Sequence, residues 1–170
     1  MTRSHYFDLV SHWRLQAPCD RVWAALTHPQ DWPRWWPGLR AVQLLHEGEA
    51  GGLGSVRRLT WVTGLGYEVK VDMLTLEVSP SHCLRGRASG MLQGEGIWLL
   101  RPQGQATSVT YVWRVELRTP WMRALAPLLA PLFRWNHQRL MAAGGAGLAR
   151  HLAQQAFSAP AHPAVRPSGG

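Results

Sequence analysis

The segment "APCDRVWAALTHPQDWPRWWPG", residues 17–38, joins a short helical pattern to a turn that is rich in tryptophan and proline. Asp20 is a suitable N-cap for a helix at 21–27, whose apolar residues recur at helical spacing. His28-Pro29 ends that helix. A second helical turn is expected to hold three tryptophans, Trp32, Trp35 and Trp36. The segment therefore predicts two short helices in succession.

Alternating apolar and polar residues predict strands on both sides of this segment. "FDLVSHWRLQ", residues 7–16, alternates and forms the first expected strand. Six more, separated by Gly-rich or Pro-containing turns, are expected at about 39–47, 55–63, 67–78, 82–89, 92–101 and 107–118. Parallel neighbours would need crossovers of a dozen residues or more, so these short connections predict an antiparallel meander.

After the last strand the pattern becomes helical. Because Pro127 and Pro131 disfavour a helix interior, only short helical pieces are expected before a long helix from 131 to about 156. Each glycine destabilises a helix by about 1 kcal/mol relative to alanine, so the three in "AAGGAG" need a compensating reason, such as the close approach of the sheet or of a ligand. We favour close packing against the rest of the protein. The remaining "SAPAHPAVRPSGG", residues 158–170, is expected to be a disordered tail beside one domain at 1–157.

Composition and charge exclude several classes of protein. An apolar fraction of 46% with 16% charged residues suits a globular interior, and no run has the length of a membrane span. The first residues lack the apolar core of a signal peptide, so a cytoplasmic location is expected. The net charge of +8 comes mainly from scattered arginines, so no nucleic-acid partner is expected. Dispersed histidines predict no metal site, and nothing in the sequence calls for a cofactor.

Several motifs occur in a fixed order along nearly the whole chain, about residues 7–153. They are the segment 17–38, "GLGSVRR", "RASGMLQGEGIWLL" followed by "ATSVTYVWRV", and the terminal "WNHQRLMAAGGAGLARHL". This order resembles the START-like (SRPBCC) superfamily, particularly its polyketide cyclase/dehydrase and lipid-transport branch. The resemblance implies an α+β helix-grip fold, in which a curved seven-stranded antiparallel sheet wraps the long C-terminal helix and leaves a cavity. Many ligands and several reactions occur on this fold, so it does not fix the activity.

In such a fold the tryptophan-proline stretch "DWPRWWPGLR", residues 31–40, closes an open end of the sheet with rigid backbone and bulky rings. Trp23 and Trp32 are expected to complete the core. For Trp35 and Trp36, a core position and a position at the rim of the cavity are equally open. We expect Trp36 to gate the exchange of ligand.

Strand alternation selects the side chains that face the cavity, and the selected set is aromatic and nearly uncharged. Together with the helix, it gives the predicted ligand contacts: Trp35, Trp36, Trp61, Tyr67, Trp98, Tyr111, Trp113, Phe133, Asn136, His137 and Leu140. Asn136 and His137 are expected to orient the ligand. The alternate set, which includes Glu68 and Asp72, is expected on a solvated face. This lining suits a large, flat or greasy ligand that is held by few polar groups.

Catalytic motifs are missing from the sequence, which contains no GxSxG, HExxH or GxxxxGK. A cyclase nevertheless needs only one general acid/base beside a polarising group, because a polyketide supplies its own nucleophile. The candidates for such roles are Arg57, Glu95 and His137.

Three functions remain open. The apolar lining and the missing motifs favour a non-enzymatic binder of an aromatic polyketide-like or acyl/lipid molecule. The family resemblance alone supports an aromatase/cyclase-like enzyme. "WMRALAPLLAPLFRW", residues 121–135, is too short to span a bilayer but suits its interface, which gives a membrane-touching lipid transfer protein as the third. Burial in a soluble protein explains that segment equally well.

Overall fold

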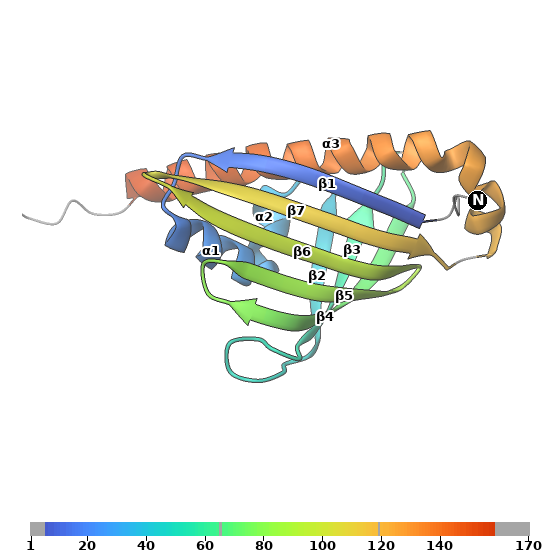
Figure 1. Ribbon diagram of the computed structural model, residues 1–170, viewed down its shortest axis with the longest axis horizontal. Coiled ribbons are helices and arrows are strands. Elements are labelled where there is room, and N and C mark those ends of the chain that lie inside the picture. The colour runs from blue at the N-terminus through green and yellow to red at the C-terminus, as the bar shows by residue number, and fades with distance from the viewer. Residues whose placement is uncertain (1–5, 65, 119, 159–170) are drawn as a thin grey trace, which may run out of the picture.

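One antiparallel sheet curves around the C-terminal helix in a computed structural model that describes residues 6–64, 66–118 and 120–158 (Figure 1). Its strands, in chain order, are β1 (Tyr6–Leu15), β2 (Leu39–His46), β3 (Val56–Val62), β4 (Glu68–Ser79), β5 (Cys83–Gly90), β6 (Leu92–Gln103) and β7 (Ala106–Leu117). The helices are α1 (Cys19–Thr27), the 3₁₀ turn η1 (Pro29–Asp31), α2 (Trp32–Trp35) and α3 (Pro120–Ser158). The spatial order of the strands is β1-β7-β6-β5-β4-β3-β2.

This architecture confirms the predicted helix-grip fold. Each predicted strand is present with both ends within two residues of the expected positions. All sheet neighbours pair antiparallel. β1 pairs with β7 and not with β2, so β1 and β2 are the two edge strands of the sheet. The register of β2 against β3 shifts at two places, and that of β4 against β5 shifts between Thr75 and Glu77. Such irregularities increase twist and bending, which a sheet needs in order to wrap a helix.

The helix starts differ from the sequence predictions. α1 begins at Cys19 with Pro18 as its N-cap, so Asp20 lies in the first turn and makes no capping hydrogen bond. Its carboxylate there still lies at the positive end of the helix dipole. The predicted second helical turn is confirmed as α2, and η1 precedes it.

α3 is one helix of 39 residues, so the prediction of a break before Pro131 is wrong. Ala130, Leu132 and Phe133 line the space between sheet and helix. Their contacts offset the cost of a proline, which is about 3 kcal/mol in a helix interior. Of the predicted tail, only Ser158 is described, as the last residue of α3, and the rest lies outside the described residues. No helix in the described ranges combines the length and apolar composition needed to cross a bilayer.

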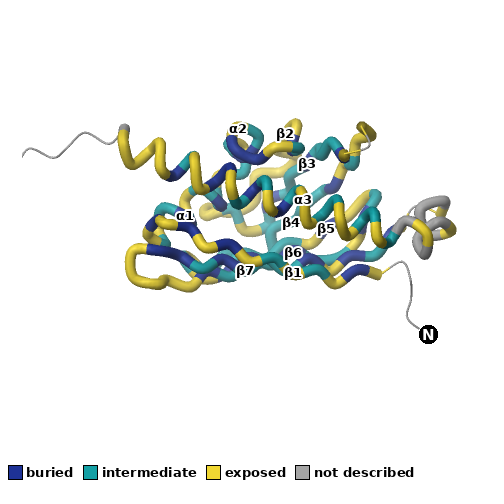
Figure 2. Tube along the Cα trace, turned by 90° about the horizontal axis from the view of Figure 1, so that it is seen from above, coloured by how far each residue is buried: buried dark blue, intermediate teal, exposed yellow. Residues whose placement is uncertain are grey.

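Glycines in the second half of α3 allow α2 and β1 to approach closely. A Cβ atom at Gly144 would lie 2.4 Å from the Trp36 ring, and one at Gly147 would lie 1.7 Å from the carbonyl oxygen of Trp35. The predicted close packing at "AAGGAG" is therefore confirmed. Buried and exposed positions alternate along α3 as its turns face the sheet and then solvent (Figure 2).

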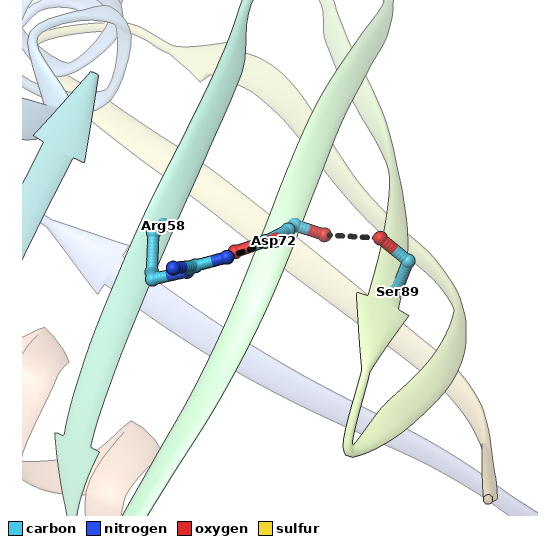
Figure 3. Close-up of polar contacts among 3 residues, drawn as sticks. All are labelled: Arg58, Asp72 and Ser89. Carbon is cyan, nitrogen blue, oxygen red and sulfur yellow. Dashed lines mark hydrogen bonds and ion pairs between the residues drawn. The ribbon is translucent and has the colours of Figure 1, made fainter. Parts of the chain in front are cut away.

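The convex face of the sheet carries paired charges, as expected for a solvated surface. Arg58 donates two hydrogen bonds to the Asp72 carboxylate, Nε to Oδ1 at 2.7 Å and Nη2 to Oδ2 at 2.8 Å. Ser89 Oγ donates to the backbone carbonyl of Asp72 at 3.4 Å (Figure 3). The guanidinium of Arg58 lowers the pKa of Asp72, chiefly through the side-chain hydrogen bond.

Candidate ligand cavity

A cavity of about 380 Å³ lies between the concave face of the sheet and α3. This volume falls in the range of small-molecule pockets. Side chains from the sheet form most of its wall, and α3, the segment from the end of α1 through α2, and the β2–β3 and β3–β4 loops form the rest. α3 packs closely on α2 and β1 at its glycines, and Phe133 of α3 packs on Phe7 of β1 with ring centroids 4.3 Å apart.

The sheet contributes alternate residues, as the strand pattern predicts. The lining residues on β3 and β4 are Arg57, Leu59, Trp61, Val69, Val71, Met73, Thr75 and, beyond a register shift, Val78, and those on β6 and β7 include Leu92, Gly96, Trp98, Tyr111 and Trp113. The ring centroids of Trp98 and Tyr111 lie 4.1 Å apart, and those of Tyr111 and Trp113 lie 6.0 Å apart. These three rings form a continuous aromatic wall against which a flat ligand can stack.

The α3 wall is the predicted stripe, because Phe133, Asn136, His137 and Leu140 all line the cavity. Asn136 Oδ1 accepts a hydrogen bond from the backbone N–H of Gly64 at 3.2 Å. This contact ties α3 to the turn between β3 and β4. Asn136 therefore has a structural contact at the cavity wall in addition to any contact with ligand.

The two adjacent tryptophans that close α2 have different positions. Trp36 lines the cavity, is 3% exposed, and donates its indole N–H to the carbonyl oxygen of Leu140 at 2.9 Å. Trp35 does not line the cavity. It stacks behind Trp36 with ring centroids 5.4 Å apart and packs on α3 at Gly147. Both rings are buried, so the segment is a core plug with one face on the cavity.

Arg57 places a guanidinium group on a largely apolar wall. Its Nη1 donates to Ser55 Oγ, and Ser55 Oγ is 3.1 Å from Thr75 Oγ1. Among the described residues, no carboxylate lies within 4.0 Å of Arg57. Burial lowers the pKa of Arg57, but arginine remains charged at neutral pH. The cavity thus contains a positive charge without an acidic partner.

Tyr111 and His137 supply two further polar groups to the cavity. Burial raises the pKa of Tyr111 far above its usual value, so its hydroxyl stays protonated. Burial also lowers the pKa of His137 to about 4, so its ring is neutral at pH 7. Neither side chain has a hydrogen-bond partner among the described residues. Both can therefore bind a polar atom of a ligand or water.

Glu95, the third catalytic candidate, lies away from the cavity. It lies on β6 between the two inward-facing glycines, opposite Arg87 on β5 and Arg114 on β7. Its neighbours in register are therefore arginines of the opposite sheet face, where strand alternation also places it.

Several lining residues were not selected from the sequence. Thr63 and Thr75 continue the alternation of β3 and β4, so extending those patterns by one more step would have found them. Leu84 and Arg85 both line the cavity near the irregular register of β4 and β5, where alternation fails. Trp135 also lines it, from a helical position next to the predicted stripe. In the described part of the chain, no group of three or more His, Cys, Asp or Glu residues is placed to hold a metal ion.

Known structures share this fold at low sequence identity. The Zhui aromatase/cyclase from Streptomyces sp. R1128 superimposes with a TM-score of 0.78 at 16% identity, covering 93% of this chain and 100% of that one. A START superfamily protein from Mycobacterium smegmatis gives 0.72 at 12%, covering 87% and 98%. The major latex-like protein 151 from Panax ginseng gives 0.64 at 14%, covering 86% and 97%. At such identities the likeness establishes the fold alone.

The sequence comparisons identify the family of the chain. No curated protein matches the chain. The family described as polyketide cyclase / dehydrase and lipid transport matches residues 8–153, which include every strand from β2 to β7 and most of α3. The chain therefore belongs to the polyketide cyclase/dehydrase and lipid-transport family of the START-like superfamily.

Proposed function

We propose that the protein binds an apolar small molecule, aromatic and polyketide-like or acyl, in the cavity between the sheet and α3. The observation that carries this proposal is an aromatic cavity with one unpaired guanidinium, that of Arg57. Apolar walls favour a ligand with large apolar surface, and a charge without a partner favours an acidic or carbonyl group at one end. The ligand is therefore amphipathic, with its polar end at Arg57 and its apolar body along Trp98 and Tyr111.

The protonation states support binding more strongly than acid–base catalysis. A histidine with a pKa of about 4 is a weak base at neutral pH, and a tyrosine with a strongly raised pKa is a weak acid. Both groups remain good hydrogen-bonding partners in these states. Oriented binding of a neutral polar group thus suits His137 and Tyr111 better than proton transfer.

Native mass spectrometry of freshly purified protein tests this function directly, because a retained molecule would add its mass to the chain. Tryptophan fluorescence provides the second measurement, since Trp61, Trp98 and Trp113 line the cavity. Titration with fatty acids and polycyclic aromatic carboxylates should give a saturable change in emission. The absence of saturable binding across both ligand classes, together with a bare mass, would contradict the proposal.

Cyclase/aromatase-like catalysis is the alternative function. It is favoured by the presence of Arg57, Tyr111 and His137 on the same cavity. Arg57 would polarise a carbonyl group of a polyketide-like substrate, whose own enol carbon is the nucleophile. Incubation with a short poly-β-ketone thioester and mass analysis for the loss of water tests it. Catalysis requires that this loss be faster with the protein than without it and that Arg57→Gln slow it.

Contact with a membrane surface is the second alternative. Large apolar side chains are exposed on α3 and at the β3–β4 turn, namely Leu128 (78% exposed), Trp135 (49%) and Tyr67 (42%), of which the last two also line the cavity. The Arg139 guanidinium lies over the Trp135 ring at 5.4 Å. An aromatic side chain beside a cation suits the interface of an anionic bilayer. Co-sedimentation with phosphatidylserine vesicles tests this alternative, and Trp135→Ala should reduce the fraction of protein that sediments. Such contact is compatible with the proposed cytoplasmic location.

A further inference from the structure

A second crevice, of about 250 Å³, lies where α2 packs on the C-terminal half of α3. It shares no residue with the ligand cavity. Arg34 and Trp35 line it from α2, and Arg150 and His151 line it from α3. Gly147 makes this junction close, since a Cβ atom there would overlap the Trp35 carbonyl.

The charged residues that line this crevice are all basic. No Asp or Glu residue belongs to its lining. Arg34 contacts Asp31 at 3.5 Å, but both side chains are largely exposed, so the pair is weak. Arg150 has no carboxylate within 4.0 Å among the described residues. Two guanidinium groups therefore face a crevice that contains no compensating charge.

The indole N–H of Trp35 adds a buried donor. Trp35 is 5% exposed, and its Nε1 has no hydrogen-bond acceptor among the described residues. A buried donor without a partner costs about 1–3 kcal/mol. The ring stacks near His151, with centroids 6.5 Å apart. Trp35 also lines the crevice, so its indole resonance should respond to a group that binds there.

His151 is oriented by a hydrogen bond on its own helix. Its Nε2 lies 2.9 Å from the amide nitrogen of Gln155, and Arg21 Nη2 donates to Gln155 Oε1 at 3.4 Å. An amide nitrogen only donates, so His151 Nε2 is the acceptor. The groups that line the crevice thus include two guanidinium groups, an imidazole and the side-chain amide of Gln154.

We propose that this crevice binds a phosphate group. Phosphate oxygens accept several hydrogen bonds from different directions, and guanidinium groups match them in charge and geometry. The phosphate belongs either to a small soluble molecule or to the headgroup of an anionic lipid. The site is independent of the proposed ligand cavity, because none of its residues lines that cavity.

The indole ¹⁵N–H resonance of Trp35, assigned with Trp35→Phe, provides the test. Titration of the full-length protein with inorganic phosphate should shift this resonance saturably, whereas chloride at equal ionic strength should not. Arg150→Gln should weaken the phosphate affinity by about tenfold or more, because it removes a charge-assisted hydrogen bond. Arg139→Gln, an exposed arginine elsewhere on α3, is the matched control and should leave the affinity unchanged.

Two further titrations distinguish the sources of the phosphate. A soluble source predicts saturation by phenyl phosphate and no effect of Arg150→Gln on binding to phosphatidate vesicles. A lipid source predicts weaker co-sedimentation of Arg150→Gln with phosphatidate vesicles and no difference with phosphatidylcholine. A Trp35 resonance that does not respond to phosphate, or that responds equally in wild type and Arg150→Gln, would overturn the proposal.

Discussion

Trp36 donates its indole N–H to the carbonyl oxygen of Leu140, at a nitrogen–oxygen distance of 2.9 Å. The bond joins the end of α2 to the middle of α3, and the same ring meets Trp13 and Trp61 edge-on, with centroids 5.6 and 5.1 Å apart. Trp36 is therefore held on several sides. Its 3% exposure argues against the gate that the sequence suggested.

Trp36→Ala should lower the free energy of unfolding by about 3–5 kcal/mol, because it removes a buried ring and leaves a cavity. Trp36→Phe should lower it less, since a ring remains and mainly the hydrogen bond to Leu140 is lost. Denaturant melts measure both. Trp135→Ala, at a half-exposed position, is the control and should change stability by about 1 kcal/mol or less. A loss below about 1 kcal/mol for Trp36→Ala, together with faster ligand exchange, would instead support the hypothesis that Trp36 gates the cavity.

Gly147→Ala should destabilise the protein although alanine is the better helix former. Helix propensity alone predicts a gain of about 1 kcal/mol, but the added Cβ would lie 1.7 Å from the Trp35 carbonyl oxygen. Backbone on both sides must shift, so the expected net loss is about 2 kcal/mol or more. The neighbouring exposed Ala146 provides the reverse control, because Ala146→Gly should cost only about 1 kcal/mol. A stabilised Gly147→Ala variant would mean that α2 packs on α3 loosely.

The cavity wall was predictable wherever strand alternation holds. β3 and β4 place Leu59, Trp61, Val69 and Met73 inward as expected, because side chains of a regular strand alternate between the two faces. The same rule put Glu95 outside the cavity, yet it was retained as a catalytic candidate for its chemistry alone. Alternation therefore located the site better than residue type did.

What sequence alone could not provide was the effect of distant packing. The sequence around Pro131 predicts a helix start, but α3 continues through this proline, and its contacts with the sheet offset the cost. Trp35 and Trp36 are adjacent and chemically identical. Only the docking of α2 on Gly147 and Gly144, more than 100 residues away in the chain, decides which of them lines the cavity.

Arg57→Gln should weaken the binding of a fatty acid or aromatic carboxylate by about tenfold to a hundredfold. The variant removes the unpaired charge, whereas the apolar walls remain. The methyl ester of the same ligand should bind wild type and variant with more similar affinity. Arg58→Gln is the matched control, because Arg58 pairs with Asp72 on the convex face (Figure 3). Fluorescence titration measures all four combinations. Equal losses for acid and ester would assign Arg57 a structural role.

His137 should make stability depend on pH. Burial lowers its pKa in the folded protein to about 4, from an ordinary value near 6.5 in the unfolded chain. Between these two values the unfolded chain binds a proton that the folded protein does not, so stability falls as the pH falls through this window. The contribution lost between pH 7 and pH 5 is roughly 2 kcal/mol. His137→Leu should abolish this contribution, so the free energy of unfolding of the variant should rise relative to that of wild type as the pH is lowered.

Denaturant melts of wild type and His137→Leu at pH 7, 6 and 5 measure this difference, in which the titration of other groups cancels. An NMR titration of the His137 ring supplies an independent value. The burial that lowers the pKa comes from the apolar walls around the ring, so the result also reports on water in the cavity. A stability difference that is constant with pH, or a ring that titrates near 6.5, would mean that water fills the space around His137. An apolar ligand would then have to displace that water, and the neutral imidazole assigned to orient it would lose its basis.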